Sequence, residues 1–299
     1  MAFHLIKRRQ RSNQDIFFDC FFNLLGFIAL FVCFYPMYFV VVASFSDPRE
    51  VITGGTFLFP KGVTLEGYRL VFADPRIWTG LRNTIGYTLG GTAISLSSTL
   101  LAAFALSRKE LPFRNVFMVF FTITMFFGGG LIPTYLTISN LGLLDSYWVM
   151  VLPFSVSVYN MIVTRTFFST NVPEELLEAA RIDGCSYTRF FLRVALPLSK
   201  AIVAVISLYY AVSYWNEYYR ALLYINDESK TTLQMVLRQI LLNNQETADQ
   251  SGVNYSARLM TSEQIKYALI VVASLPIMVV YPFLQKFFAK GVMLGSIKG

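Results

Sequence analysis

Six long runs of uncharged, mostly apolar residues limit what this chain can fold into. They cover residues 20–46, 83–107, 115–144, 146–164, 201–216 and 267–285. Each run approaches or exceeds the ~17–25 residues that an α-helix needs to cross a bilayer, and we expect the short fifth run to extend through Glu217 toward Leu222. Lipid offers no partner to backbone polar groups, so such a segment must pair them internally, as a helix does. The sequence therefore predicts an all-α polytopic membrane protein with six transmembrane helices.

The composition agrees with this class and excludes several chemistries. Hydrophobic residues make up 55% of the chain and charged residues only 14%, whereas a soluble domain carries about a quarter charged residues. One histidine and three cysteines are too few for a metal site or a disulfide framework. The sequence has no glycine-rich P-loop for ATP. We expect a non-enzymatic chain with no metal or cofactor of its own.

Basic residues indicate the orientation, because cytoplasmic loops of membrane proteins are enriched in Lys and Arg. With the amino terminus inside, the inner segments hold 15 of the 25 basic residues but only 7 of the 18 acidic ones. Both termini are then cytoplasmic. A nucleic-acid-binding protein would gather its cations on one soluble face, whereas these follow the inner edge of the membrane. No nucleic-acid partner is expected.

The predicted spans lack the residues that ion-coupled transport requires. Their central parts contain no Asp, Glu, Lys or His, and proton- or ion-coupled carriers usually bury such a residue to relay charge. Uphill transport costs about 1.4 kcal/mol for each tenfold gradient. Any such energy must therefore come from a partner, which disfavours a self-sufficient channel or secondary carrier.

One inner loop carries a spaced motif. Three residues separate Glu178-Ala179-Ala180 from Gly184, and nine residues separate Gly184 from Val194-Ala195-Leu196-Pro197. Pro173 suits the first turn of a helix, and the two glutamates after it face the positive end of the helix dipole. Gly184 suits a helix end with φ above zero, and Ser186 suits the N-cap of a second helix. The alternative is an ordinary surface loop, but the full spacing favours a helix–turn–helix over residues 169–198.

This spacing resembles the EAA signature of permease subunits of bacterial ATP-binding-cassette (ABC) importers, with Val194 where Ile is usual. The resemblance implies that the loop docks onto a separate cytoplasmic ATPase, which binds the ATP and Mg. The docking residues it implies are Glu178, Ala179, Ala180, Arg181, Asp183, Gly184, Leu196 and Pro197.

Further motifs are similar to carbohydrate importers. Ile132-Pro133-x-Tyr135-Leu136, Leu141-Gly142-Leu143, Trp215-Asn216-Glu217 and the tail from Lys290 to Gly299 look like the second, G-type permease of maltose-type systems. Residues 125–130 look like the branch for oligosaccharides and polysaccharide fragments. A permease of a non-sugar ABC importer is the alternative, and the tail argues against it.

The family implies a type I ABC importer fold in the bacterial plasma membrane. Its partners would be a homologous second permease, two ATPase subunits and an extracytoplasmic sugar-binding protein. Candidate pathway-lining residues are Tyr135, Trp215, Asn216 and Glu217, and candidate tail contacts with the ATPase are Gly291, Gly295 and Lys298.

The chain is expected to form a basic tail over residues 1–15 and one permease domain over 16–299. Within the domain lie the EAA loop at 169–198, a long outer loop at 223–264 and a cytoplasmic tail at 289–299.

An apolar stripe of helical spacing begins at Leu233 and should lie on the membrane or on other helices. The polar stretch 243–254 after it reads as a mobile segment, either a solvated loop or a binding-protein contact through Asn243, Asn244, Gln245 and Asn254. Small residues at Gly86, Gly90 and Gly91 suggest close packing, and Gly128-Gly129-Gly130 should break the third span.

Overall fold

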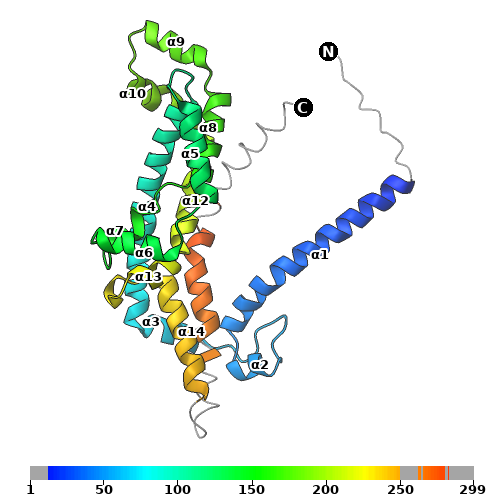
Figure 1. Ribbon diagram of the computed structural model, residues 1–299. Coiled ribbons are helices and arrows are strands. Elements are labelled where there is room, and N and C mark those ends of the chain that lie inside the picture. Colours follow the sequence, from blue (N-terminus) through cyan, green and yellow to red (C-terminus); the bar gives the residue numbers. More distant parts are fainter. Residues whose placement is uncertain (1–12, 250–261, 264, 280–281, 283–299) are drawn as a thin grey trace. The chain divides into compact units, whose positions relative to one another are not determined.

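A computed structural model describes residues 13–249, 262–263, 265–279 and 282. Every regular element in these residues is a helix, which agrees with the predicted all-α class (Figure 1). The chain forms two compact units: residues 1–70 with 251–271, and residues 71–250 with 272–299.

The first unit is built on one long apolar helix. α1 covers Asn13–Ser44 and exposes apolar side chains along most of its length, becoming buried only near Val42 to Ser44. Its end is held by a 2.7 Å hydrogen bond between the hydroxyls of Ser44 and Tyr68. α2 (Pro48–Ile52) begins where the Asp47 carboxylate accepts from the Arg49 amide. The exposed apolar surface of α1 suits a surrounding of lipid or other helices.

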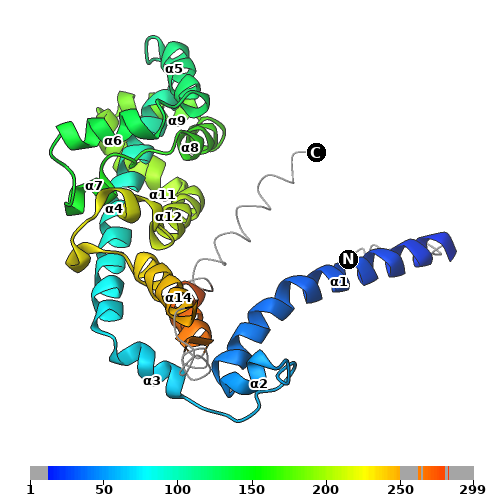
Figure 2. The same ribbon diagram turned by 60° about the horizontal axis from the view of Figure 1, so that its bottom comes forward.

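The second unit is arranged around α4, which covers Pro75–Ser107. The Asp74 side chain caps its start by accepting from the Arg76 amide at 2.9 Å. Three helices pack along α4: α8 (Val158–Asn171), α12 (Lys200–Trp215) and α14 (Leu233–Asp249) (Figure 2). The remaining elements of this unit outside the EAA loop are α5 (Arg114–Phe126), α6 (Leu131–Asn140), α7 (Tyr147–Val151), α13 (Tyr219–Tyr224) and the 3₁₀ turn η2 (Glu228–Lys230). The boundary between the two units falls within α3 (Glu66–Ala73).

Gly86, Gly90 and Gly91 of α4 lie against tyrosine side chains, which agrees with the close packing that their small size suggested. A Cβ at Gly91 would come within 2.5 Å of the Tyr214 ring. The Tyr214 hydroxyl bonds with Ser95 at 2.9 Å and also donates to the Val151 carbonyl. One turn farther along, Tyr210 bonds with Thr99 at 2.6 Å. α4 and α12 are thus joined by buried polar pairs as well as by apolar packing.

The predicted spans differ in continuity. Among the described residues, α1 and α4 are long and apolar enough to cross a membrane, and up to four spans result if each sharply bent helix pair counts as one. α5 and α6 meet at 111° across the glycine break, as predicted. The fourth run is divided between α7 and α8, with Pro153 in the intervening turn. The last helix in this part of the chain, Ile265–Val279, is shorter.

The outer segment corrects one prediction. The apolar stripe of α14 packs on α4, with Leu233 and Val236 fully buried, as its spacing indicated. The helix then continues through residues 243–249, where the sequence suggested a mobile loop. Packing on α4 stabilises the first turns of α14, which offsets the free-energy cost of helix nucleation. The polar residues that follow can then extend the same helix.

Candidate functional site

The EAA segment folds as the predicted helix–turn–helix. α9 covers Glu174–Ile182, and α10 (Tyr187–Phe190) continues through the π-helical turn η1 (Phe191–Ala195) into α11 (Leu196–Leu198). We call residues 174–198 the EAA hairpin. Pro173 lies one position before α9, as its N-cap, rather than in its first turn. In Figure 1 the hairpin lies at one end of α4, beyond the end of α8.

Two residues make the turn, both as predicted. Gly184 has φ +75°, a left-handed conformation that is cheap only without a Cβ. The Cys185 amide then reaches back to the Ala180 carbonyl at 2.9 Å, which pairs one of the free carbonyls at the end of α9. Ser186 caps α10 by accepting from the Arg189 amide at 3.3 Å.

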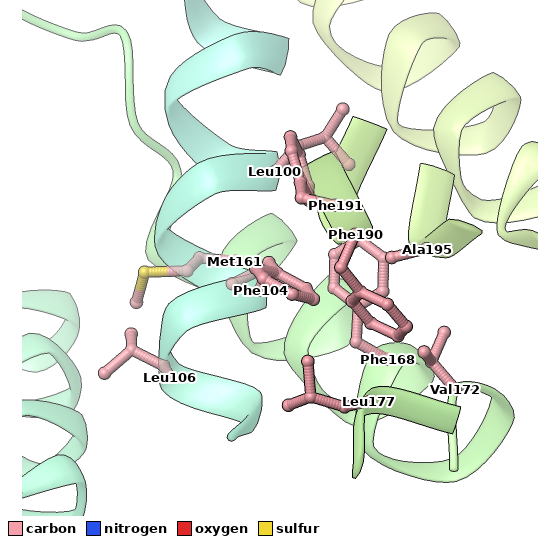
Figure 3. Close-up of a cluster of buried hydrophobic side chains, with 11 residues drawn as sticks. Leu100, Phe104, Leu106, Met161, Phe168, Val172, Leu177, Phe190, Phe191 and Ala195 are labelled. Carbon is pink, nitrogen blue, oxygen red and sulfur yellow. The ribbon is translucent and has the colours of Figure 1, made fainter. Parts of the chain in front are cut away.

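The inner face of the hairpin is anchored in an apolar cluster. Leu177 is 1% exposed and lies with Phe104 of α4, Phe168 of α8 and Phe190 of α10 (Figure 3). Ala180 packs against the same cluster. The two alanines therefore differ in environment: Ala180 is half-buried where α9 meets the bundle, and Ala179 is exposed.

The outer face presents a small apolar surface with acidic neighbours. Ile182 is 87% exposed and Leu176 42% exposed, on either side of Ala179. Glu178 and Asp183 are also exposed. The predicted contact with an ATPase would therefore fall on an exposed face that combines apolar and acidic side chains.

The Arg181 guanidinium makes contacts within the chain, and the ATPase contact implied by the resemblance stays a prediction. The guanidinium forms an ion pair with Glu110 and lies 5.5 Å from the centre of the Tyr187 ring. The Tyr187 hydroxyl donates to the same carboxylate, and this bond raises the pKa of Tyr187. The sequence gave no signal for this pairing, since Glu110 lies in a separate loop.

The neighbours of Glu110 also contact the hairpin. Lys109 pairs with Glu174 at 2.6 Å, and this contact raises the pKa of Lys109 and lowers that of Glu174. Arg108 is buried beside them and donates to backbone carbonyls at the end of α8. The sequence alone marks Arg108 and Lys109 only as cations that indicate membrane orientation, with no signal for these contacts.

The four candidate pathway-lining residues are engaged in separate contacts. Tyr135 stacks on Tyr224 with ring centres 6.0 Å apart. Trp215 is buried and donates its indole N–H to the Ala273 carbonyl at 3.1 Å. Asn216 is exposed and donates to the Val212 carbonyl. Trp215 is therefore packed within this chain, and the pathway-lining role of these four residues stays a prediction.

Glu217 forms the best-enclosed ion pair of this region. Its carboxylate lies 2.8 Å from Nε of Arg220, with both side chains about 15% exposed or less. The Arg220 guanidinium also lies over the rings of Phe154 and Tyr214, at 4.9 and 5.3 Å. The carboxylate of Glu217 is thus matched by a cation within the chain.

Some predicted site residues lie outside what the structure describes. Gly291, Gly295, Lys298 and Asn254 fall in undescribed segments, and Asn243, Asn244 and Gln245 belong to α14 without described side chains. Their predicted contacts stay predictions. In the described ranges, no three His, Cys, Asp or Glu side chains are grouped to hold a metal ion.

Comparison with known proteins identifies the class. The family described as binding-protein-dependent transport system inner membrane component matches residues 98–294, a range that contains the whole EAA hairpin. The chain belongs to this family. It is a non-catalytic inner-membrane permease subunit of an ABC importer, a class of protein that works with an ATPase and a substrate-binding protein.

Individual relatives cover nearly the whole chain. Protein LplC of Bacillus subtilis is 43% identical over 88% of this chain and 89% of its own length. The polygalacturonan/rhamnogalacturonan transport system permease protein YtcP of the same organism is 41% identical, covering 92% and 97%. A chain from the crystal structure of a bacterial ABC transporter involved in import of the acidic polysaccharide alginate aligns with a TM-score of 0.85. That chain is 31% identical, with coverage of 94% and 99%.

Proposed function

We propose that this chain is a transmembrane permease subunit of an ATP-driven importer that translocates a carbohydrate delivered by an extracytoplasmic binding protein. The observation that carries the coupling part is the EAA hairpin. It is anchored through Leu177 and presents the open side chain of Ile182 beside exposed Glu178 and Asp183. Such a surface fits an apolar socket with a basic rim on a cytoplasmic ATPase.

The substrate class rests on the relatives. YtcP is named for polygalacturonan and rhamnogalacturonan, and the structural relative for the polysaccharide alginate. We propose an oligosaccharide as the cargo. The motifs around Tyr135 and in the carboxyl-terminal tail, which resemble those of carbohydrate importer permeases, also support a carbohydrate substrate.

The assembly we propose contains a homologous second permease and two ATPase subunits, which bind ATP and Mg. This chain would supply six spans of a type I importer fold, with both termini in the cytoplasm. The tail residues Gly291, Gly295 and Lys298 would contact the ATPases. The exposed apolar surface of α1 supports a place in lipid or against the second permease.

The outer segment supports a role in receiving the binding protein. α14 is fixed to α4 by its buried apolar stripe, so the polar residues from Asn243 onward begin at a defined place. We propose that residues 243–254 form part of the binding-protein contact.

Reconstitution tests this function. The chain, with its cognate second permease, ATPase and binding protein, is placed in liposomes and supplied with ATP. We expect uptake of labelled oligogalacturonides, alginate oligosaccharides or maltooligosaccharides, and stimulation of ATP hydrolysis by the loaded binding protein. Uptake of an amino acid or a metal ion in place of every carbohydrate would overturn the proposed substrate class. Transport without the ATPase would overturn the proposed coupling.

A further inference from the structure

We propose that Arg108, Lys109 and Glu110 form a clamp that fixes the EAA hairpin to the end of α4, so that α4 moves with the hairpin during transport. We call these residues the 108–110 clamp. The inference rests on the proposed ATPase-docking function of the hairpin, and it assigns positioning roles to three residues outside the EAA motif.

Arg108 holds the point from which the hairpin departs. It is 6% exposed, and its guanidinium donates to the carbonyls of Phe168 and Val172 at 3.2 and 3.3 Å. The Phe168 carbonyl already accepts from the Val172 amide, so the guanidinium is its second donor, and the cation also matches the negative end of the helix dipole. These carbonyls belong to the end of α8, directly before α9. Arg108 thereby ties the end of α4 to the root of the hairpin.

Lys109 holds the first residue of α9. Its ammonium lies 2.6 Å from the Glu174 carboxylate. An exposed pair of this kind contributes little to stability, because solvent screens it. It does fix the direction in which α9 leaves the bundle, since Glu174 opens the helix.

Glu110 spans the turn of the hairpin. One carboxylate oxygen pairs with Arg181 near the end of α9, and the other accepts from the Tyr187 hydroxyl at the start of α10. Gly184 lies between these two contacts. The clamp therefore holds the hairpin at its root, at the start of α9 and across its turn.

The far part of α4 is bonded to a different segment. The Thr84 hydroxyl accepts from the Leu233 amide at 2.8 Å, at the start of α14. Tyr87 donates to the Lys230 carbonyl at 2.8 Å, and Asn83 donates to carbonyls of the same turn. From Thr84 to Arg108, α4 rises about 36 Å at 1.5 Å per residue. One helix thus bears the ATPase-facing hairpin at one end and the start of the outer helix toward the other.

Polar contacts at both places make α4 suited to transmit displacement. Apolar packing alone, such as Leu177 against Phe104, permits sliding between alternative arrangements, whereas directed hydrogen bonds and ion pairs specify one register. Coupling between sites requires an element that both sites bias. Both the hairpin and the segment 229–233, which contains the end of η2 and the start of α14, are bonded to α4.

A charge-swap experiment tests the clamp in the reconstituted complete importer. Lys109→Glu and Glu174→Lys are made singly and together, and sugar transported per ATP hydrolysed is measured beside the amount of ATPase retained. We expect each single variant to assemble but to lose about fivefold or more in transport per ATP. The double variant restores the pair with its charges exchanged and should recover most of that loss, which a general structural defect would not allow.

Lys200→Glu is the matched control. It makes the same change of charge on the proposed cytoplasmic side, and Lys200 is exposed with no ion pair to a described residue. We expect wild-type transport per ATP from this variant. Glu110→Gln, which weakens the bond to Arg181 without adding charge, should reduce transport per ATP in the same direction as the single swaps.

The outcomes separate the clamp from the docking proposal. If Ile182→Glu lowers ATPase retention while the Lys109 and Glu174 variants transport normally, docking stands and the clamp is overturned. The clamp is also overturned if the double variant is no better than the singles. If Ile182→Glu and both swaps leave retention and transport unchanged, the docking function itself fails.

Discussion

At Gly184 the backbone conformation, rather than crowding by neighbouring atoms, explains the need for glycine. Its φ is +75°, yet a Cβ built there meets no atom within 4 Å. A side chain therefore has room, and only the left-handed conformation opposes it. Ile182, two residues earlier, shows the complementary case, since its backbone is ordinary and its exposed side chain is the feature.

The effect of a substitution at Gly184 should depend on how much free energy the new residue needs to adopt the left-handed conformation. Gly184→Val places a β-branched residue in the left-handed region, at a cost of about 1–3 kcal/mol. Gly184→Asn, which tolerates that region better, should cost less. We expect Val to misdirect α10 and lower ATPase retention and stimulated hydrolysis, and Asn to stay near wild type. Equal retention in the two variants would contradict a backbone cause.

α4 shows at the scale of an element how small residues determine packing. Gly91 lies against the buried Tyr214 ring, whereas the nearest atom to a Cβ at Gly86 is 3.8 Å away, an ordinary contact. Tyr214 has little freedom to move, because its hydroxyl bonds with Ser95 and Val151. Two glycines five residues apart on one helix therefore have different requirements.

Alanine at these two glycines should separate packing from helix propensity. Gly91→Ala should destabilise the chain by about 1–3 kcal/mol through overpacking. Gly86→Ala should be neutral or stabilise by up to about 1 kcal/mol, since Ala favours helix over Gly. Thermal unfolding of the two purified variants in detergent provides the comparison. A lower midpoint for Gly86→Ala than for Gly91→Ala would reverse the assignment.

At the scale of the whole molecule, the distribution of charge predicts the orientation of the chain in the membrane. The cations near the EAA hairpin belong to the predicted inner segments, whereas Lys61 lies in the predicted first outer loop. Lys61 and Arg189 are both exposed. These two positions are predicted to lie on opposite sides of the membrane.

Cysteine labelling tests that orientation. In a cysteine-free background, Lys61→Cys should react with a membrane-impermeant maleimide in intact cells. Arg189→Cys should react only after permeabilisation, because the positive-inside rule places the hairpin in the cytoplasm. Labelling of Arg189→Cys in intact cells would invert the topology.

The outer segment gives a second prediction at this scale. Deleting residues 244–252 removes the polar end of α14 and leaves its buried stripe from Leu233 to Ile240 in place. We expect an assembled complex with basal ATP hydrolysis but weaker stimulation by the binding protein. Stimulation and uptake equal to wild type would assign the segment to solvent.

The sequence by itself determined the features that depend on neighbouring residues. The EAA spacing, the turn at Gly184 and the cap at Ser186 were predictable because backbone conformation and capping act within a few positions. The all-α class followed from apolar runs, and the packed stripe of α14 from its helical period. The break at Gly128-Gly129-Gly130 was predictable for the same local reason.

Only the tertiary structure decided which distant residues meet. Arg181 pairs with Glu110, 71 positions away, and Trp215 donates to Ala273, 58 positions away. The continuation of α14 beyond Leu242 required its packing on α4, because the polar residues there carry no strong helical signal of their own. Charge and periodicity in the sequence indicate that a side chain will be paired or buried. Which residue it contacts depends on how the helices pack in space, and no local sequence pattern encodes that packing.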